Sequence, residues 1–173
     1  MSGFQTTVFL QQGAGVPGEL YNSYPHRTQS YILNSGSAAN NIIGSTCCTL
    51  TSQGLVAAGG TGIFAGFLVD PKNIALFGAP GSTPLSPTLV VPNNTQVECL
   101  TESSIWVTLP AAAAIGDVII FNQTTGQISS QIPSAALSSG FSFANAVVDY
   151  FTVTAAGLAV ITVTPQQNPY VAQ

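Results

Sequence analysis

The chain has 173 residues, which is long enough for one domain with its own hydrophobic core and short for two. Only 5% of the residues are charged, against roughly 25% in an ordinary soluble domain, whereas 46% are hydrophobic, so a disordered chain is not expected. Lys and Arg total 2 and the net charge is −4, which leaves nothing to neutralise a run of phosphates, so neither nucleic acid nor a membrane is expected as a partner.

A surface with so few charges also lacks the long-range repulsion that keeps monomers apart, and it has few strongly hydrated side chains that would be costly to bury. Such a surface suits permanent contacts. We therefore expect a structural subunit that works inside a larger assembly.

Residues 1–30 predict an extended N-terminal arm. Residues 6–11 have the character of a strand, and the glycines and prolines of residues 12–25 prevent a regular element, so the arm needs a surface to lie against. Residues 1–10 carry no basic residue before an apolar run, and a secretory signal is not expected.

Gly13, Gly15 and Gly18 have the spacing of a dinucleotide-binding loop. The match is weak, because Pro25 prevents a clean helix after it and no acidic residue lies about twenty positions further on to bind a ribose. No cofactor is therefore expected.

The remainder of the chain predicts a series of short strands. Prolines and glycines interrupt nearly every helical window, and β-branched and aromatic residues fill the runs between them, which points to a sandwich or a barrel. Alanines allow short helical turns at residues 111–115 and 134–138, and the prolines of residues 78–92 predict an extended loop. The expected strands are residues 30–33, 47–51, 55–58, 63–69, 74–77, 88–91, 96–100, 105–109, 118–122, 127–130, 146–154 and 158–164.

Residues 54–69 form the one apolar stretch that resembles a membrane span. As a helix they would extend about 24 Å, short of a hydrocarbon core of about 30 Å, and five glycines interrupt them. Two buried strands joined by a turn at Gly59, Gly60, Thr61 and Gly62 are the better interpretation.

No group of residues predicts catalysis or metal binding. His26 is the only histidine, and Cys47, Cys48 and Cys99 contain no C-x-x-C pair, so we expect three buried thiols of a reducing compartment instead of a zinc site. Glu98 and Glu102 would lie about 13 Å apart on a continuous strand, beyond the range of paired carboxylates in glycoside hydrolysis, and are expected to be solubilising charges at a strand edge. The chain is therefore not expected to be an enzyme.

Aromatic residues allow one binding hypothesis. Trp106 with the phenylalanines at 121, 141, 143 and 151 has the composition of a sugar-binding platform, although core packing is the default for such side chains. The tyrosines at 21, 24 and 31 support the same alternative of a glycan-binding or adhesive module on a virion surface.

The arm resembles the start of a known family, the structural cement or head decoration proteins of tailed bacteriophages. The resemblance begins with the phrase Phe4, Gln5, Thr6, Thr7, Val8, which Phe9 follows, and continues through the Pro17, Gly18, Glu19 step to Asn22, Pro25 and Arg27. Later phrases are similar too: residues 54–58 resemble a Gly-Leu-Val-Ala-Gly block with Ala58 in place of the last glycine, and Gly116 and Asp117 resemble a Gly-Asp-x-Val step.

This resemblance implies a virion protein, made in the host cytoplasm, with a β-sandwich or jelly-roll domain at residues 31–173 behind the arm. It implies a homo-oligomer, a trimer in preference to a dimer, that lies on the outside of the capsid and clamps neighbouring major capsid subunits together. The implied contacts lie on the arm, at Phe4, Gln5, Thr6, Thr7, Val8, Phe9, Pro17, Gly18 and Arg27. A pilus-like structural subunit is a further alternative, but it would need a secretion signal.

Overall fold

The computed structural model describes residues 15–22, 25–69 and 89–165. In that part of the chain the regular elements are strands and one short 3-10 helix, η1, at Ala38–Asn40. The strands are β1 (Arg27–Leu33), β2 (Cys47–Leu50), β3 (Val56–Ala58), β4 (Phe64–Val69), β5 (Thr95–Leu109), β6 (Val118–Asn122), β7 (Ile128–Gln131), β8 (Phe141–Asp149) and β9 (Gly157–Val163).

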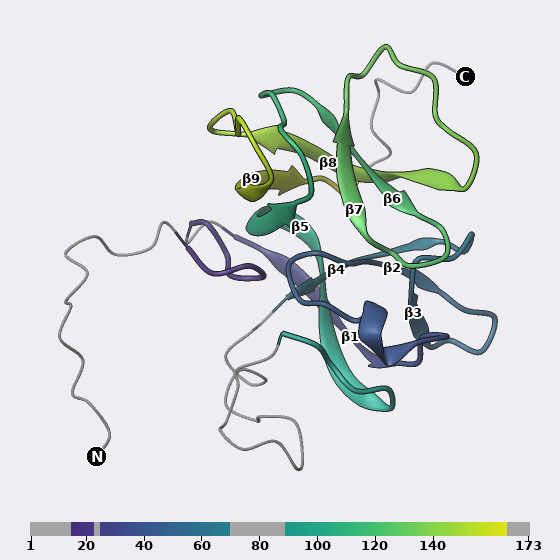
Figure 1. Cartoon of the computed structure of the whole chain (residues 1–173). Helices are drawn as coiled ribbons and strands as arrows, with labels where there is room; N and C mark the ends of the chain where they lie inside the picture. Colours follow the sequence, from purple (N-terminus) through teal and green to yellow (C-terminus); the bar gives the residue numbers. More distant parts are fainter. Residues whose placement is uncertain (1–14, 23–24, 70–88, 166–173) are drawn as a thin grey trace, which may run out of the picture.

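Five of the strands close into a barrel. The order β1-β3-β2-β4-β5 returns to β1, which pairs antiparallel with β5 along its whole length. The pairing of β1 with β3 is parallel and consists of the single register pair Leu33 and Val56. The barrel forms the lower half of the molecule in Figure 1.

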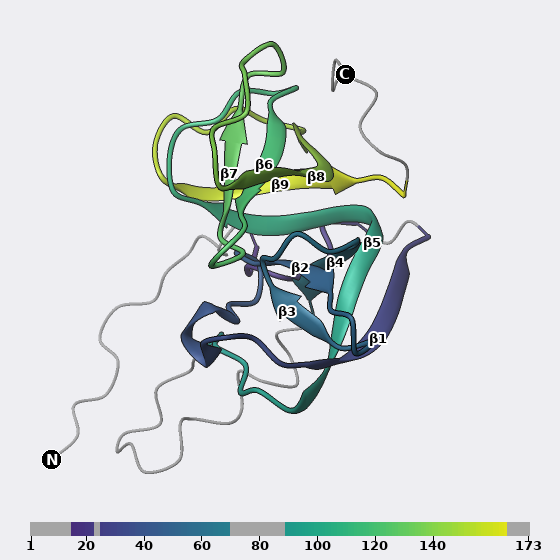
Figure 2. The same ribbon diagram turned by 90° about the vertical axis from the view of Figure 1, so that its right-hand side faces the viewer.

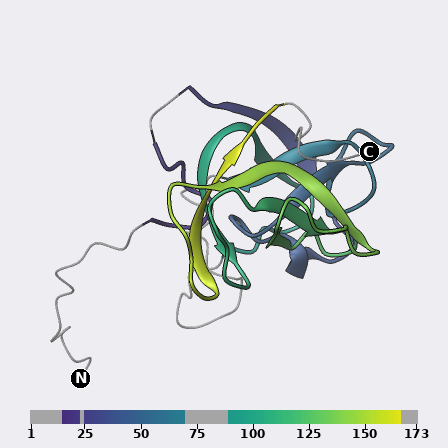
Figure 3. The same ribbon diagram turned by 90° about the horizontal axis from the view of Figure 1, so that it is seen from above.

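A second sheet continues from the same long strand. β5 pairs with β1 as far as Glu102 and with β9 from Ser103 onward, and the order then runs β9-β8-β6-β7. Figure 2 shows β5 bending between the two halves, and Figure 3 shows from above that the second sheet lies across the barrel. β5 therefore connects the barrel and the second sheet through one continuous backbone.

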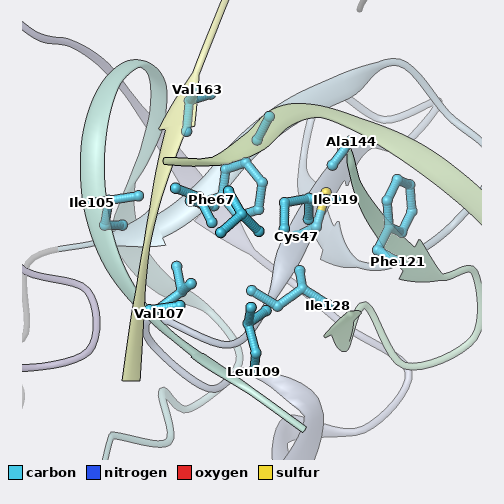
Figure 4. Close-up of a cluster of buried hydrophobic side chains, with 14 of the residues drawn as sticks. Cys47, Phe67, Ile105, Val107, Leu109, Ile119, Phe121, Ile128, Ala144 and Val163 are labelled. Carbon is cyan, nitrogen blue, oxygen red and sulfur yellow. The ribbon is translucent and has the colours of Figure 1, made fainter. Parts of the chain in front are cut away.

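The described residues form two hydrophobic cores, and the alternation of side chains along each strand decides which core a residue enters. One core fills the barrel, with Leu33, Cys48 and Cys99 among its members. The other lies between the barrel and the second sheet, where Cys47 and Phe67 of the barrel meet Ile105, Ile119 and the other residues drawn in Figure 4. The neighbouring residues Cys47 and Cys48 thus point to opposite faces of β2.

The strand predictions are largely confirmed within the described residues. The runs predicted at 96–100 and 105–109 are one strand, because the residues between them stay extended while the chain changes its pairing partner. The run predicted at 146–154 begins earlier and ends at Asp149, since Tyr150 has a positive φ of 67°. The run predicted at 88–91 is wrong as a strand where it is described, and only Val90 bridges to Ile42. The runs predicted at 6–11 and 74–77 lie outside the described residues.

The two predicted helical turns are wrong. In residues 111–115 the intrinsic preference of alanine is overridden, because Ala113 and Val153 exchange two backbone hydrogen bonds of 2.8 Å. Residues 134–138 contain turns without a helix. Residues 54–69 form β3 and β4 around a glycine turn, as predicted, and no helix in the described ranges is long and apolar enough to span a membrane.

The all-β class is confirmed, while a sandwich or jelly-roll body is not. What the described residues form is a barrel joined to a second sheet by β5. The predicted boundary between arm and body at residue 30 falls inside β1.

Candidate functional site

The N-terminal segment, residues 15–22, lies along the edge of β5 that β9 leaves free. The Gly18 and Tyr21 amides donate to the carbonyls of Trp106 and Ser104 at 2.7 and 2.9 Å, and the Trp106 amide donates to the Glu19 carbonyl at 2.9 Å. Leu20 and Ile105 form an antiparallel bridge. The segment that follows the Phe4 to Phe9 phrase therefore adds a short strand to its own chain's second sheet.

The Pro17 and Gly18 step packs against Ile43 and Gly44, and the close approach of the two backbones requires glycine. Gly44 has a φ of +70°, and a Cβ on it would lie 2.4 Å from the Gly18 nitrogen and 2.5 Å from the Pro17 carbonyl carbon. Gly18 has a φ of +87°, and a Cβ on it would lie 2.1 Å from Cγ2 of Ile43. Both residues are therefore fixed by contacts within this chain.

An aromatic cluster of Tyr21, Trp106, Tyr150 and Phe151 surrounds the same segment. The Tyr21 ring lies 5.3 Å from the Trp106 ring and 4.4 Å from the Tyr150 ring, and Phe151 lies 5.7 Å from Trp106. Gly15 lies on the indole, where a Cβ would be 2.4 Å away. Trp106 is buried, whereas Tyr21 and Tyr150 are 37% and 43% exposed.

Tyr150 is held in its unusual backbone conformation by Asp149. One carboxylate oxygen of Asp149 accepts a hydrogen bond from the Tyr150 amide and the other accepts one from the Thr162 hydroxyl, both at 2.8 Å. The Tyr150 hydroxyl accepts a hydrogen bond of 3.2 Å from the Asn22 side chain. The turn between β8 and β9 therefore clamps the N-terminal segment from outside.

The predicted contact residues are only partly brought together. Pro17 and Gly18 lie in the N-terminal segment, and Arg27 begins β1, where it lines a groove of about 570 Å³ between the barrel and the second sheet. The six predicted contacts from Phe4 to Phe9 lie outside the described residues.

The aromatic platform predicted around Trp106 is divided by the fold. Trp106 contacts Phe151, as expected, but Phe121 belongs to the core between the two halves and lines the groove of Arg27 together with Phe143. No sequence signal indicates Tyr150, because its contact with Tyr21 depends on the pairing of distant strands.

The residues considered for catalysis or metal binding stay apart. His26 is exposed, while Cys47, Cys48 and Cys99 are buried free thiols, and the described ranges hold no cluster of three or more metal-binding side chains. Burial raises the pKa of Cys47 well above its usual range, and a hydrogen bond with Cys99 does so for Cys48. Glu98 and Glu102 are exposed on β5, an inner strand, so their predicted place at a sheet edge is wrong.

Comparison with known proteins gives one family and one similar structure of interest. Residues 4–164 match the family described as structural cement protein (E217 gp24/Pam3 gp6). A chain from a structure titled "The capsid of Myoviridae Phage XM1" has a TM-score of 0.61 and 14% identity, over 93% of this chain and 97% of that chain. No curated protein matches.

Proposed function

We propose, from the premise that this chain belongs to the phage structural cement proteins, that it binds the outside of the capsid and clamps neighbouring major capsid subunits together. Membership of the family makes the chain a structural protein of a phage capsid, located in the virion, and it is not a family of enzymes. The match over nearly the whole chain, residues 4–164, is the observation that carries the proposal.

The scarcity of charge supports a role in permanent contacts. Only 5% of the residues are charged, so little of the surface has to be stripped of tightly bound water when it meets a neighbour. A contact of this kind depends on apolar burial and hydrogen bonds, both of which persist at the ionic strength of a cell.

The arm supplies the proposed clamp. Residues 4–9 have two threonines and a valine between two phenylalanines, a β-branched and aromatic composition that suits an extended strand added to the sheet edge of a neighbour. Burial of about 500 Å² of apolar surface at about 25 cal/mol per Å² would contribute about 12 kcal/mol before ordering costs. The backbone hydrogen bonds between residues 18–21 and β5 support this role, because they anchor the chain a few residues after the segment 4–9.

A homotrimer at a local symmetry axis is the proposed oligomer, in preference to a dimer. Repetition of one modest contact over a symmetric shell multiplies its strength through avidity. Light scattering of the purified protein should give about 53 kDa, which is three chains of 17.7 kDa. A mass of about 35 kDa or of one chain would contradict the trimer.

The decisive test mixes purified full-length protein with undecorated capsids and sediments them. Co-sedimentation at a fixed ratio to the major capsid protein is expected, and its absence would contradict the proposal.

Deletion of residues 1–12 should weaken capsid binding or oligomerisation more than it weakens folding. Normal binding by the truncated chain would contradict the role of the arm.

Glycan binding is the second candidate, and the Tyr21 and Tyr150 pair favours it. Two half-exposed rings at 4.4 Å suit contact with a sugar face. For this candidate, the wild-type protein should bind specific glycans on an array, and the Tyr150→Ala variant should lose that binding. Hits with no capsid binding would favour this candidate over the cement role.

A further inference from the structure

A large recess lies beside Arg27, between the barrel and the second sheet. Its volume of about 570 Å³ lies within the range of binding sites. It is lined by the start of β1, the start of β4 with the preceding Gly62 and Ile63, and the first half of β8, together with Thr101 of β5, Phe121 of β6 and Pro165. We call this recess the Arg27 groove.

The wall formed by β8 is a strand edge. Successive residues of a strand point to opposite faces, yet Ser142 and its neighbour Phe143 both line the groove, and so does Phe121, the register partner of Ser142 on β6. The groove therefore reaches both faces of β8 at this end. β8 pairs with β6 near this end, whereas β9 joins it only from Ala146. No described residue pairs with residues 141–144 on the side away from β6. Within the described residues, the main-chain groups at this edge therefore have no strand partner and suit an added strand.

The groove is apolar on one side and carries a positive charge on the other. Phe64 and Phe143 line it, and Ile63 at its rim is 76% exposed, the most exposed large apolar side chain among the described residues. Arg27 is opposite Glu102 across the register of β1 and β5, but its guanidinium forms no ion pair with any described residue. The complementary ligand is an extended segment with an apolar side chain and a carboxylate.

The charge of Arg27 argues against residues 1–14 and 166–173 as the occupant of the groove. Residues 1–14 and 166–173, the two terminal segments outside the described ranges, contain no Asp or Glu. An arm or tail from this chain or from a second copy would therefore bring no acidic side chain to Arg27. A strand from another protein can bring both features together.

We propose that the Arg27 groove binds an extended acidic segment of the major capsid protein, which adds to the free edge of β8, pairs a carboxylate with Arg27 and packs an apolar side chain on Ile63 and Phe143. This inference rests on the proposed function, which supplies the capsid as partner. It adds a receiving site on the body to the donating arm, so that each copy both gives and accepts a strand.

The test measures binding of full-length variants to undecorated capsids. Arg27→Glu should weaken binding about tenfold to a hundredfold, because a charge-assisted hydrogen bond is replaced by repulsion, and Arg27→Lys should retain part of the affinity. Ile63→Asp should weaken binding similarly. Ile132→Asp is the matched control, since Ile132 is 64% exposed and does not line the groove, and it should bind like the wild type.

The occupant is identified by a photo-crosslinking residue, p-benzoylphenylalanine, placed at Ile63. Crosslinks to an Asp- or Glu-containing peptide of the major capsid protein support the proposal. Crosslinks only to another segment of this chain, such as residues 166–173 or residues 70–88 with Asp70, or to a second copy overturn it. If the wild type binds capsids and both Arg27→Glu and Ile63→Asp bind with the same affinity, the proposed role of the groove is wrong and the cement role stands. If the wild type does not bind capsids, both proposals are wrong.

Discussion

Single residues set the position of the N-terminal segment. Gly18 belongs to a glycine pattern with the spacing of a nucleotide-binding loop, but its role is a close contact with Ile43 and Gly44. The two glycines bring two backbones closer than any side chain would allow. The Pro-Gly phrase of the family thus has a physical reason in this chain, which is to dock the base of the arm.

Gly44→Ala is expected to destabilise the protein by at least about 2 kcal/mol. The new Cβ would occupy the left-handed region and also lie 2.4 Å from the Gly18 backbone nitrogen, which cannot move away cheaply. Gly54→Ala is the matched control, because Gly54 has a similar φ of +75° with open space around it, and it should cost about 1 kcal/mol. Urea unfolding measures both, and equal costs would contradict the contact.

The buried thiols predict a loss of stability in alkali. The pKa of Cys47 is raised by burial and that of Cys48 by its hydrogen bond with Cys99, so the folded protein keeps protons that the unfolded chain releases. Stability is therefore full below about pH 9.0, the usual thiol value, and falls above it by about 1.4 kcal/mol per pH unit for each thiol. Urea unfolding between pH 7 and pH 10.5 measures this, and a flat profile would contradict it. The double variant Cys47→Ala, Cys48→Ala should have a flatter profile.

At the scale of elements, β5 determines the architecture. Its first half belongs to the barrel and its second half to the second sheet, where one edge pairs with β9 and the other with the N-terminal segment. The period-2 pattern of the sequence located both halves. It contained no information on which strands would pair with them, because side-chain alternation is the same for any partner.

Deletion of residues 1–22 is expected to destabilise the protein far more than deletion of residues 1–12. The longer deletion removes three backbone hydrogen bonds with β5 and the cover over Trp106, together worth about 4–6 kcal/mol, which corresponds to a Tm lower by about 10–20 °C. Trp106 is the only tryptophan, so its emission should shift to the red only in the longer deletion. An unchanged emission maximum would contradict this role of the segment.

At the scale of the whole molecule, neutrality is the dominant property. Arg27 is the only Lys or Arg in the described residues, and it lies in a groove instead of on an open face. An ordinary soluble domain has roughly 25% charged residues, whereas this chain has 5% and only two Lys or Arg in 173 residues. Apart from the proposed contact of Arg27, contacts with neighbours are then expected to be made by apolar and neutral polar groups.

Capsid attachment is therefore expected to depend little on salt. Raising NaCl from 0.1 to 0.5 M should change the affinity for undecorated capsids less than about fivefold, because few ion pairs are present to be screened. Sedimentation at increasing salt measures it. Release of the protein by moderate salt alone would contradict the neutral interface.

The sequence by itself determined the class of the protein and its family. Alternating β-branched and aromatic runs between glycines and prolines are local signals, and so are the family phrases and the lack of residues for catalysis. Only the tertiary structure decided that β1 closes a barrel through Leu33 and Val56, that Tyr150 covers Tyr21, and that Arg27 shares a groove with Phe143. These contacts join residues far apart in the chain, and strand alternation specifies the face of a side chain without specifying its neighbour.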